Sequence, residues 1–453
     1  MQDRVPSLAE AERLRAANKP VEDALRLHPV YKGKIQTVPK CPIRGLEDFS
    51  VWYTPGVAAP CKAIQADPAA AYLHTNKGNT VAIVSDGTRV LGLGDIGPLA
   101  GLPVMEGKAL LFKYLGGVDA VPICLDTKEP DEIVRIVRAL APSFGGINLE
   151  DISQPKCFRI LDALRNTMPI PVWHDDQQGS ATVLLAGLLG ALRVVGKDIR
   201  RIKIAMIGTG AANISVYRLL VASGVDPHAV IACDSKGTLH PGRQDIAERQ
   251  AEYRDKWRIC RESNSARRAG GPAAALDGAD VCIAFSQSGP GVIHPQWIGS
   301  MARDAIVFAC ANPVPEIWPW EAHAAGARIV ATGRSDFPNQ VNNSLVFPGV
   351  FRGVLDCRAR TITDTMAIAA AAELVRCAER RGLADEAILP PMDDADVAAR
   401  VAAATGVQAQ IDGVSRLRRS YDELHQAALT AIGGARRATD VLMREGVIAP
   451  PPS

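Results

Sequence analysis

Two pairs of acidic residues follow short apolar stretches in the middle of the chain. Glu150 and Asp151 end the segment INLED, and Asp175 and Asp176 end the segment IPVWHDD. Carboxylates that converge repel one another unless a cation lies among them, and oxygen ligands without His or Cys favour Mg²⁺ or Mn²⁺. The pattern indicates a divalent-metal site; helix caps or solvated loop charges are the alternative for any single acid.

The segment between the two acidic pairs explains how they could meet. Its apolar residues recur with helical spacing, so the stretch 147–176 is predicted as strand, helix and strand; the residues are Phe158, Ile160, Leu161 and Leu164. Parallel strands joined by a crossover helix end at the same edge of a sheet, where ligands of open α/β sheets bind. We therefore expect the four carboxylates to lie at one edge.

A candidate base and a tyrosine beside a turn lie earlier in the chain. Lys108 begins a predicted helix, KALLFKYLGGV, where the helix dipole disfavours a cation and lowers its pKa. A solvated surface lysine is the alternative interpretation. Tyr53 precedes a Thr-Pro-Gly turn, where a tyrosine is more commonly a packing residue.

A glycine-rich turn indicates a dinucleotide site in the second half. Residues 201–207 are predicted as a strand that enters Gly-Thr-Gly, followed by a helix to residue 222 and a strand at 230–233. Glycines in that position let a pyrophosphate approach the helix N-terminus. Asn213 stands where a third glycine or alanine is common, and an α/β unit without a nucleotide is the alternative. The predicted contacts are Gly208, Gly210, Ala211, Ala212 and Asn213.

The choice between NAD and NADP depends on the residues after the next strand. Asp234 suits a ribose 2′-hydroxyl and hence NAD. Ser235, Lys236 and the nearby Arg243 could instead meet a 2′-phosphate, so we predict a preference for NADP and keep NAD as the alternative.

The remaining pattern predicts an α/β protein with a doubly wound sheet. Strands are predicted at 80–85, 120–125, 281–285, 305–309 and 328–331, with a hairpin at Asp86-Gly87 returning over 89–93. Helices are predicted at 7–18, interrupted by Pro20, and at 130–140, 361–383 and 417–445. Asn312 and Asn343 follow late strands, where an amide can orient a carboxylate or a nicotinamide. The predicted domains are 1–178 for substrate and metal, 179–370 for the nucleotide and 371–453 for C-terminal helices.

Composition excludes several classes of function. The chain has 453 residues, 47% of them hydrophobic, and a net charge of +2, which argues against a nucleic-acid or membrane partner. Ten cysteines without a Cys-x-x-Cys pair favour reduced thiols in the cytoplasm. The N-terminus does not resemble a signal peptide, and the longest apolar run, 181–195, is too short to span a bilayer.

Several long stretches together resemble the malic enzymes, specifically the short bacterial form that prefers NADP and lacks a phosphotransacetylase-like extension. The resemblance implies a malic domain, an NAD(P)-binding Rossmann-type domain and a homodimer or larger oligomer. It implies oxidative decarboxylation of L-malate to pyruvate and CO₂ with a divalent metal. The matching stretches are YTPGVAAPC, VLGLGDIGPLAGLPVMEGKALLFKYLGGVDAVPICLD, FGGINLEDI, PVWHDDQQGSA, CDSKG, CANPVPEI and TGRSDFPNQVNNSLVFPGVFRG.

The resemblance also assigns roles to individual residues. Tyr53 resembles the family's general acid, Lys108 its general base, and Asp175 the acid beside that lysine. Arg89 resembles an arginine that binds the substrate carboxylate but is often missing from the short bacterial forms. The other matched positions are the metal ligands Glu150, Asp151 and Asp176, and the orienting amides Asn312 and Asn343.

Two departures from the family pattern keep a second substrate class open. Gln178 and Ser180 replace a His and a Thr that are common after the double Asp. Both lie next to the expected metal site, so a related 2-hydroxy acid, such as a phosphono or substituted malate, is the alternative substrate. A non-catalytic protein that keeps the fold is disfavoured because Tyr53, Lys108 and the carboxylates are all present.

Overall fold

The computed structural model describes residues 8–452, and its first sheet is parallel throughout. The strand order is β2-β1-β3-β4. The strands are β1 (Thr80–Ser85), β2 (Asp119–Cys124), β3 (Gly146–Leu149) and β4 (Val172–His174). Leu149 pairs with His174, so the two acidic pairs leave neighbouring strands at the same edge. The predicted strand–helix–strand unit is confirmed.

Helices cover this sheet with the faces that their sequences make apolar. They are α5 (Gly97–Gly116), α6 (Pro130–Leu140) and α7 (Lys156–Arg165). Helix α6 starts with Pro130 and has Asp131 and Glu132 in its first turn, as a helix N-terminus favours. Its buried residues pack with those of α7 and with one face of β1, β3 and β4 in one apolar cluster.

The second sheet is doubly wound, as predicted, with the order β10-β9-β8-β5-β6-β7. Its strands are β5 (Ile204–Ile207), β6 (Val230–Asp234), β7 (Gly237–Thr238), β8 (Val281–Ala284), β9 (Ala305–Ala309) and β10 (Ala327–Thr332). Neighbouring pairs are parallel except β6 and β7. The strand order reverses between β5 and β8, the position at which open α/β sheets bind their ligands. The associated helices are α9 (Ala211–Ala222), α10 (Gln244–Ala247), α11 (Arg254–Glu262), α12 (Pro272–Leu276), α13 (Pro295–Ile298) and α14 (Pro319–Ala324).

A buried helix joins the two sheets. A π-helical turn, η3 (Asp175–Gly179), follows β4 and continues into α8 (Ser180–Val195). Among the described residues, Asp175–Val195 is long and apolar enough to cross a membrane, but 72% of its most apolar window is buried, as in a core helix. Helix α8 packs against α9 and against the C-terminal helix α16 (Asp364–Arg381).

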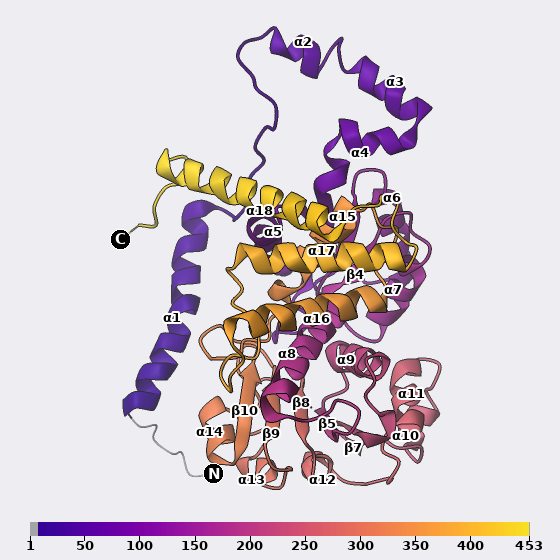
Figure 1. Cartoon of the computed structure of the whole chain (residues 1–453), viewed down its shortest axis with the longest axis vertical. Coiled ribbons are helices and arrows are strands. Elements are labelled where there is room, and N and C mark those ends of the chain that lie inside the picture. Colours follow the sequence, from indigo (N-terminus) through magenta and orange to yellow (C-terminus); the bar gives the residue numbers. More distant parts are fainter. Residues whose placement is uncertain (1–7, 453) are drawn as a thin grey trace.

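The C-terminal helices return to the first sheet. They are α15 (Phe347–Asp356), α16 (Asp364–Arg381), α17 (Ala395–Ile411) and α18 (Tyr421–Arg444), with the 3₁₀ helix η5 (Asn343–Leu345) before them. Helix α17 contacts α15, α16 and α18, while α15 and α18 pack on α5 (Figure 1). The sequence predicted α16 and α18 but missed α17.

The N-terminal elements stand apart from both sheets. Helix α1 (Leu8–Tyr31) runs through Pro20, so the predicted interruption is wrong; the proline removes one N–H donor without ending the helix. Residues 36–75, here called the arm, contain α2 (Asp48–Trp52), α3 (Ala58–Ala66) and α4 (Ala71–His74). Figure 1 shows these three helices at the top of the view, away from the strands.

Candidate active site

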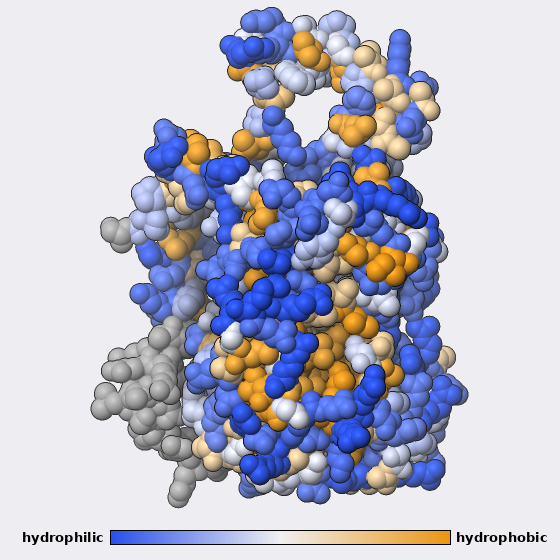
Figure 2. Space-filling view, viewed as in Figure 1, coloured by the Kyte–Doolittle hydropathy of each residue, from blue (hydrophilic) through white to orange (hydrophobic). Residues whose placement is uncertain are grey.

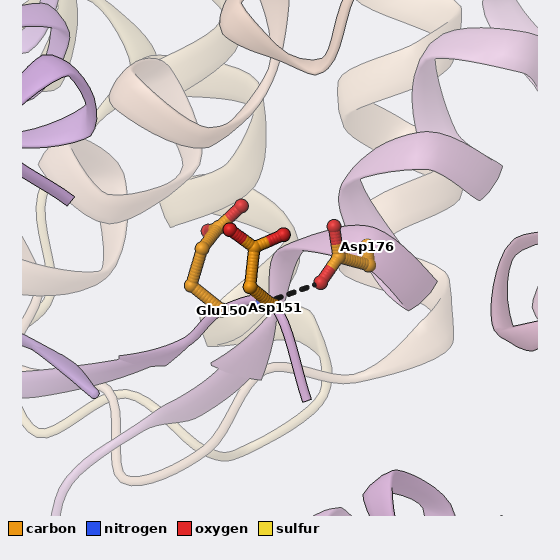
Figure 3. Close-up of side chains that lie close together, drawn as sticks. All are labelled: Glu150, Asp151 and Asp176. Carbon is orange, nitrogen blue, oxygen red and sulfur yellow. Dashed lines mark hydrogen bonds between the residues drawn. The ribbon is translucent and has the colours of Figure 1, made fainter. Parts of the chain in front are cut away.

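Three carboxylates meet at the carboxyl edge of the first sheet (Figure 3). Glu150 and Asp151 follow β3, and Asp176 lies in η3 after β4; one oxygen of each lies within 4.8 Å of the others. The backbone amide of Asp151 donates to Asp176 Oδ2 at 2.8 Å. Asp151 also has a left-handed backbone, with φ +55°, a strained conformation that is common at functional sites.

Burial and mutual repulsion act against ionisation of all three carboxylates. Burial raises the pKa of Glu150 well above its ordinary value, and the charges of Asp176 and Asp175 add to this effect. Burial and Asp176 raise the pKa of Asp151 to about 8, and burial raises the pKa of Asp176. Asp151 Oδ2 is buried without a hydrogen-bond partner in the described part of the chain. Such an oxygen-only set of acids fits a hard divalent cation.

Lys108 lies beside this cluster. Its Nζ is 2.6 Å from Asp175 Oδ2 and 3.0 Å from Glu150 Oε1. Burial opposes the ammonium form, but Asp175 and Glu150 outweigh it and raise the pKa of Lys108. The expectation of a helix-start lysine with a lowered pKa is wrong, because α5 begins at Gly97 and Lys108 lies in its interior.

Gln178, one of the two departures from the family pattern, is held inside the π-helical turn. Gln178 Oε1 accepts from the backbone amide of His174 at 3.0 Å, and Thr182 Oγ1 donates to the Gln178 carbonyl at 2.6 Å. The glutamine side chain therefore folds back on the end of β4. A Cβ at Gly179 would lie 2.0 Å from Asp175 Oδ1, so any other residue there would displace that carboxylate. π-Helical turns are frequent at functional sites.

Arg89 lies in a loop, because the predicted hairpin with a return strand at 89–93 does not form. The Asp86 carboxylate accepts from the Thr88 amide and pairs with Lys156 instead of supporting a hairpin turn. The Gly87 carbonyl accepts from the amide of Gly97, where α5 begins. The Arg89 amide donates to the Asp151 carbonyl at 3.0 Å, and the Arg89 charge opposes the raised pKa of Asp176.

Tyr53 is not brought to Lys108 within the chain. It caps the end of α2 on the arm, and 70% of its surface is exposed. Figure 1 shows α2 far from β4 and α8, the elements before and after the η3 turn that carries Asp175 and Asp176. The predicted acid and the predicted base therefore lie in separate regions of one chain.

The glycine turn after β5 has the shape that a dinucleotide site requires. Gly208 has φ +91°, and a Cβ there would lie 2.5 Å from the Phe285 carbonyl oxygen. Gly210 precedes the first helical residues, Ala211 and Ala212. Asn213 Nδ2 donates to the carbonyls of residues 207 and 208 at 3.0 and 2.8 Å, so this side chain fastens the turn. The sequence did not indicate that role.

The end of β6 and the segments that follow it carry a cluster of charged side chains. Arg243 binds both carboxylate oxygens of Asp234 at 3.0 Å, and Lys256 lies 3.3 Å from the same group. Burial opposes ionisation of Asp234, but Arg243 outweighs it and lowers the Asp234 pKa. Lys236 Nζ pairs with Asp245 at 3.2 Å, and Ser235 adjoins it in the chain. Lys256 was missed because α11 lies some twenty residues further along the chain.

Two predicted amides lie where the two sheets approach each other. A Cβ at Gly92 of the Arg89 loop would be 2.3 Å from the Asn312 carbonyl oxygen, so these backbones touch. Asn343 lies in η5, and its Cβ would be 3.2 Å from a Cβ at Gly179. Asn312 thus joins the second sheet to the Arg89 loop, and Asn343 adjoins the acidic turn.

Comparisons with known proteins agree with this architecture. The chain matches the family models "Malic enzyme, N-terminal domain" over residues 32–165 and "Malic enzyme, NAD binding domain" over residues 177–410. It is 49% identical over 384 residues to the NAD-dependent malic enzyme of Geobacillus stearothermophilus, covering 85% of this chain and 78% of that protein. It is 48% identical over 360 residues to the NADP-dependent malic enzyme of Rhizobium meliloti (strain 1021), covering 79% of this chain and 46% of that protein. The crystal structure of the Entamoeba histolytica enzyme aligns with a TM-score of 0.95 at 47% identity, covering 99% of this chain and 94% of that one.

Proposed function

Because the chain belongs to the malic enzyme family, which oxidatively decarboxylates malate with NAD(P), we propose residue roles for that reaction. Glu150, Asp151 and Asp176 hold a divalent cation, Mg²⁺ or Mn²⁺. The observation that carries this proposal is three converging carboxylates with raised pKa values, one of them with an unpartnered buried oxygen. The cation supplies Lewis-acid polarisation of the substrate's C2 oxygen.

Lys108 and Asp175 act as a pair in the oxidation step. Lys108 in its neutral form takes the proton of the malate C2 hydroxyl as hydride leaves C2, and Asp175, 2.6 Å away, holds the resulting ammonium. Asp175 and Glu150 both raise the lysine pKa, so the neutral form requires that the Glu150 charge be engaged elsewhere. A cation bound by Glu150, Asp151 and Asp176 would engage the Glu150 charge in this way.

Arg89 and the two amides orient the substrate. Arg89 lies on the loop that binds the Asp151 carbonyl, which directs its charge toward the acidic cluster and suits a malate carboxylate. Asn312 and Asn343 flank the junction between the substrate loop and the cofactor sheet. This arrangement supports roles for the three side chains as donors to a small dicarboxylate.

We propose a preference for NADP. Asp234 is occupied by Arg243 and Lys256, so it is poorly placed to accept from a ribose 2′-hydroxyl. Lys236, Arg243 and Lys256 bring three cations to the turn, against the two carboxylates of Asp234 and Asp245. The excess of positive charge suits a 2′-phosphate. Relatives of nearly equal sequence identity are named for NAD or for NADP, so sequence identity alone does not indicate which cofactor this chain prefers.

The exposed arm supports a homodimer or larger homo-oligomer in which Tyr53 serves a second copy. Large apolar side chains lie open on the arm, including Leu46 with 85% and Leu73 with 75% of its surface exposed. Figure 2 shows apolar atoms on the projecting arm at the top of the view. Exposed apolar surface of this kind marks an interaction site. We propose that the arm docks on another copy and that Tyr53 protonates C3 of the enolate formed there.

The domain organisation and location are proposed on the same basis. The substrate and metal domain covers residues 1–178, the nucleotide domain 179–370 and the C-terminal helices 371–453, with the first boundary inside η3. All ten cysteines are free, which supports a reducing cytoplasm.

A steady-state assay tests the proposed function. Malate-dependent formation of NADPH or NADH is followed by absorbance with Mn²⁺ and then after chelation. The expected result is pyruvate formation that requires the cation and has a lower KM for NADP than for NAD. Turnover that survives complete chelation would contradict the metal proposal, and a lower KM for NAD would contradict the cofactor proposal.

A further inference from the structure

Glu316 is a buried carboxylate that the proposed reaction does not use. None of its surface is exposed, and it lies shortly before α14. One of its oxygens accepts from the amide of Ser286 at 2.8 Å and from its hydroxyl at 3.0 Å. The other accepts from the amide of Ala311 at 3.0 Å. Ser286 follows β8 and Ala311 follows β9, so one side chain ties two strand ends together.

The loops beyond those strand ends are joined by further hydrogen bonds. Gly289 donates its amide to the Val314 carbonyl at 3.1 Å, and Ser288 Oγ bonds the same residue. Ile293 donates its amide to the Glu316 carbonyl at 3.2 Å. Residues 286–293 and 310–316 therefore form one unit, with the Glu316 carboxylate at its base.

This unit lies on the nicotinamide side of the crevice. The pyrophosphate turn follows β5, and the adenosine side is marked by Asp234 at the end of β6. In a doubly wound sheet the cofactor crosses the point where the strand order reverses, so its redox end lies over β8 and β9. The two loops held by Glu316 follow these strands.

The same unit touches the substrate domain. It carries Asn312, whose carbonyl oxygen would be 2.3 Å from a Cβ at Gly92. Gly92 belongs to the loop of Arg89, which binds the Asp151 carbonyl. A shift of the unit would therefore change the distance between the cofactor side and the substrate side of the cleft.

We propose that Glu316 is a positioning residue for hydride transfer, which holds the β8 and β9 loops in register with the Arg89 loop; this rests on the proposed function. Its two oxygens accept from three donors, and a carboxylate meets such donors more strongly than a neutral group does. A glutamine would keep one acceptor oxygen and turn an NH₂ group toward an N–H donor. The substitution therefore loosens the base of the unit while preserving side-chain size.

The test compares Glu316→Gln with wild type in the full-length protein. The first readout is malate oxidation with malate and with malate deuterated at C2. The second is proton exchange at C3 of pyruvate, which reports the acid–base machinery without hydride transfer. We expect kcat for oxidation to fall roughly tenfold to a hundredfold, as misplacement of reacting groups does. The deuterium isotope effect on kcat should rise, and C3 exchange should stay near the wild-type rate.

A matched control is Glu321→Gln, which alters a carboxylate on α14 that accepts from the Trp318 amide; it should leave both rates unchanged. If Glu316→Gln does not fold, Ser286→Ala removes only the hydroxyl donor and should give a smaller fall in kcat with the same rise in isotope effect. Unchanged oxidation, or equal loss of oxidation and exchange, would overturn the proposal. If the wild-type protein does not exchange protons at C3 of pyruvate, that result would instead count against the proposed function.

Discussion

The acidic cluster and the arm differ in how much of their environment the chain itself supplies. Glu150 and Asp175 are buried, and both bind Lys108 within the chain. Tyr53 has 70% of its surface exposed, on an arm whose apolar side chains are open to solvent. Within one chain, the predicted base is thus surrounded by its partners, whereas the predicted acid is open to solvent.

This difference follows from how each region is built. Neighbouring parallel strands end side by side, so the pairing of Leu149 with His174 brings the acidic groups together whatever else the chain does. The arm is made of short helices without a sheet beneath them, and α2 has only five residues. Helices of that length depend on packing, which a second copy can supply.

The largest effect is expected from a substitution of the lysine beside the acidic cluster. Lys108→Ala should lower kcat for malate oxidation by about 10²–10⁴, the usual range for a general base. Lys113→Ala is the control on the same helix, because Lys113 pairs with Asp119 at the surface. Activity of Lys108→Ala within a factor of about two of wild type would remove Lys108 from the proposed chemistry.

Asp176→Asn should separate metal binding from cofactor binding. Removing one ligand charge is expected to weaken Mn²⁺ binding by more than about a hundredfold. This exceeds the loss of affinity that follows when a residue hydrogen-bonded to a metal ligand is removed. Cofactor affinity, measured by NADPH fluorescence, should change little because the glycine turn lies in the other sheet. Asp162→Asn, an exposed acid paired with Arg254, serves as control. Wild-type Mn²⁺ affinity in Asp176→Asn would refute the ligand assignment.

A smaller effect is expected at the cofactor turn. Lys236→Ala should raise the KM for NADP about tenfold, equivalent to one charge-assisted contact, and should leave the KM for NAD nearly unchanged. Lys203→Ala is the control, since that lysine lies at the amino end of β5. Equal changes for the two cofactors would count against recognition of a 2′-phosphate.

The smallest effect concerns stability without metal. The Asp151 pKa is about 8 in the folded protein, against about 3.9 in an unfolded chain. The folded state holds the extra proton between these values, so the free energy of unfolding should fall as pH rises from about 4 to about 8. The Tm of metal-free protein should therefore drop between pH 6 and 8. Asp176→Asn should flatten this dependence, and an equally steep slope would show that the acids do not interact.

The sequence predicted the regular parts of the fold well for a physical reason. Buried parallel strands such as Thr80–Ser85 are short apolar runs, and α6 has a clear start at Pro130. The errors came from residues whose partners lie far away in sequence. Pro103 lies inside α5, so the helix was placed too late and Lys108 appeared to begin it.

The site was predictable where strand ends determine it and not where tertiary contacts do. The meeting of Glu150, Asp151 and Asp176 followed from the strand–helix–strand pattern. Lys256 reaches Asp234 from a separate helix, and Glu316 reaches two strand ends, without any local signal for either contact. The placement of Tyr53 away from Lys108 likewise depends on the path of the arm, which spacing does not reveal.

Subunit complementation tests most directly whether the catalytic set is divided between copies. Tyr53→Phe and Lys108→Ala chains, carrying different tags, are co-expressed and the mixed oligomer is purified through both tags. If Tyr53 serves the partner's Lys108, a mixed dimer contains one site with both groups, and pyruvate formation should recover to about half the wild-type rate per dimer. Each parent oligomer should remain impaired. A mixed dimer no more active than its parents would contradict the account.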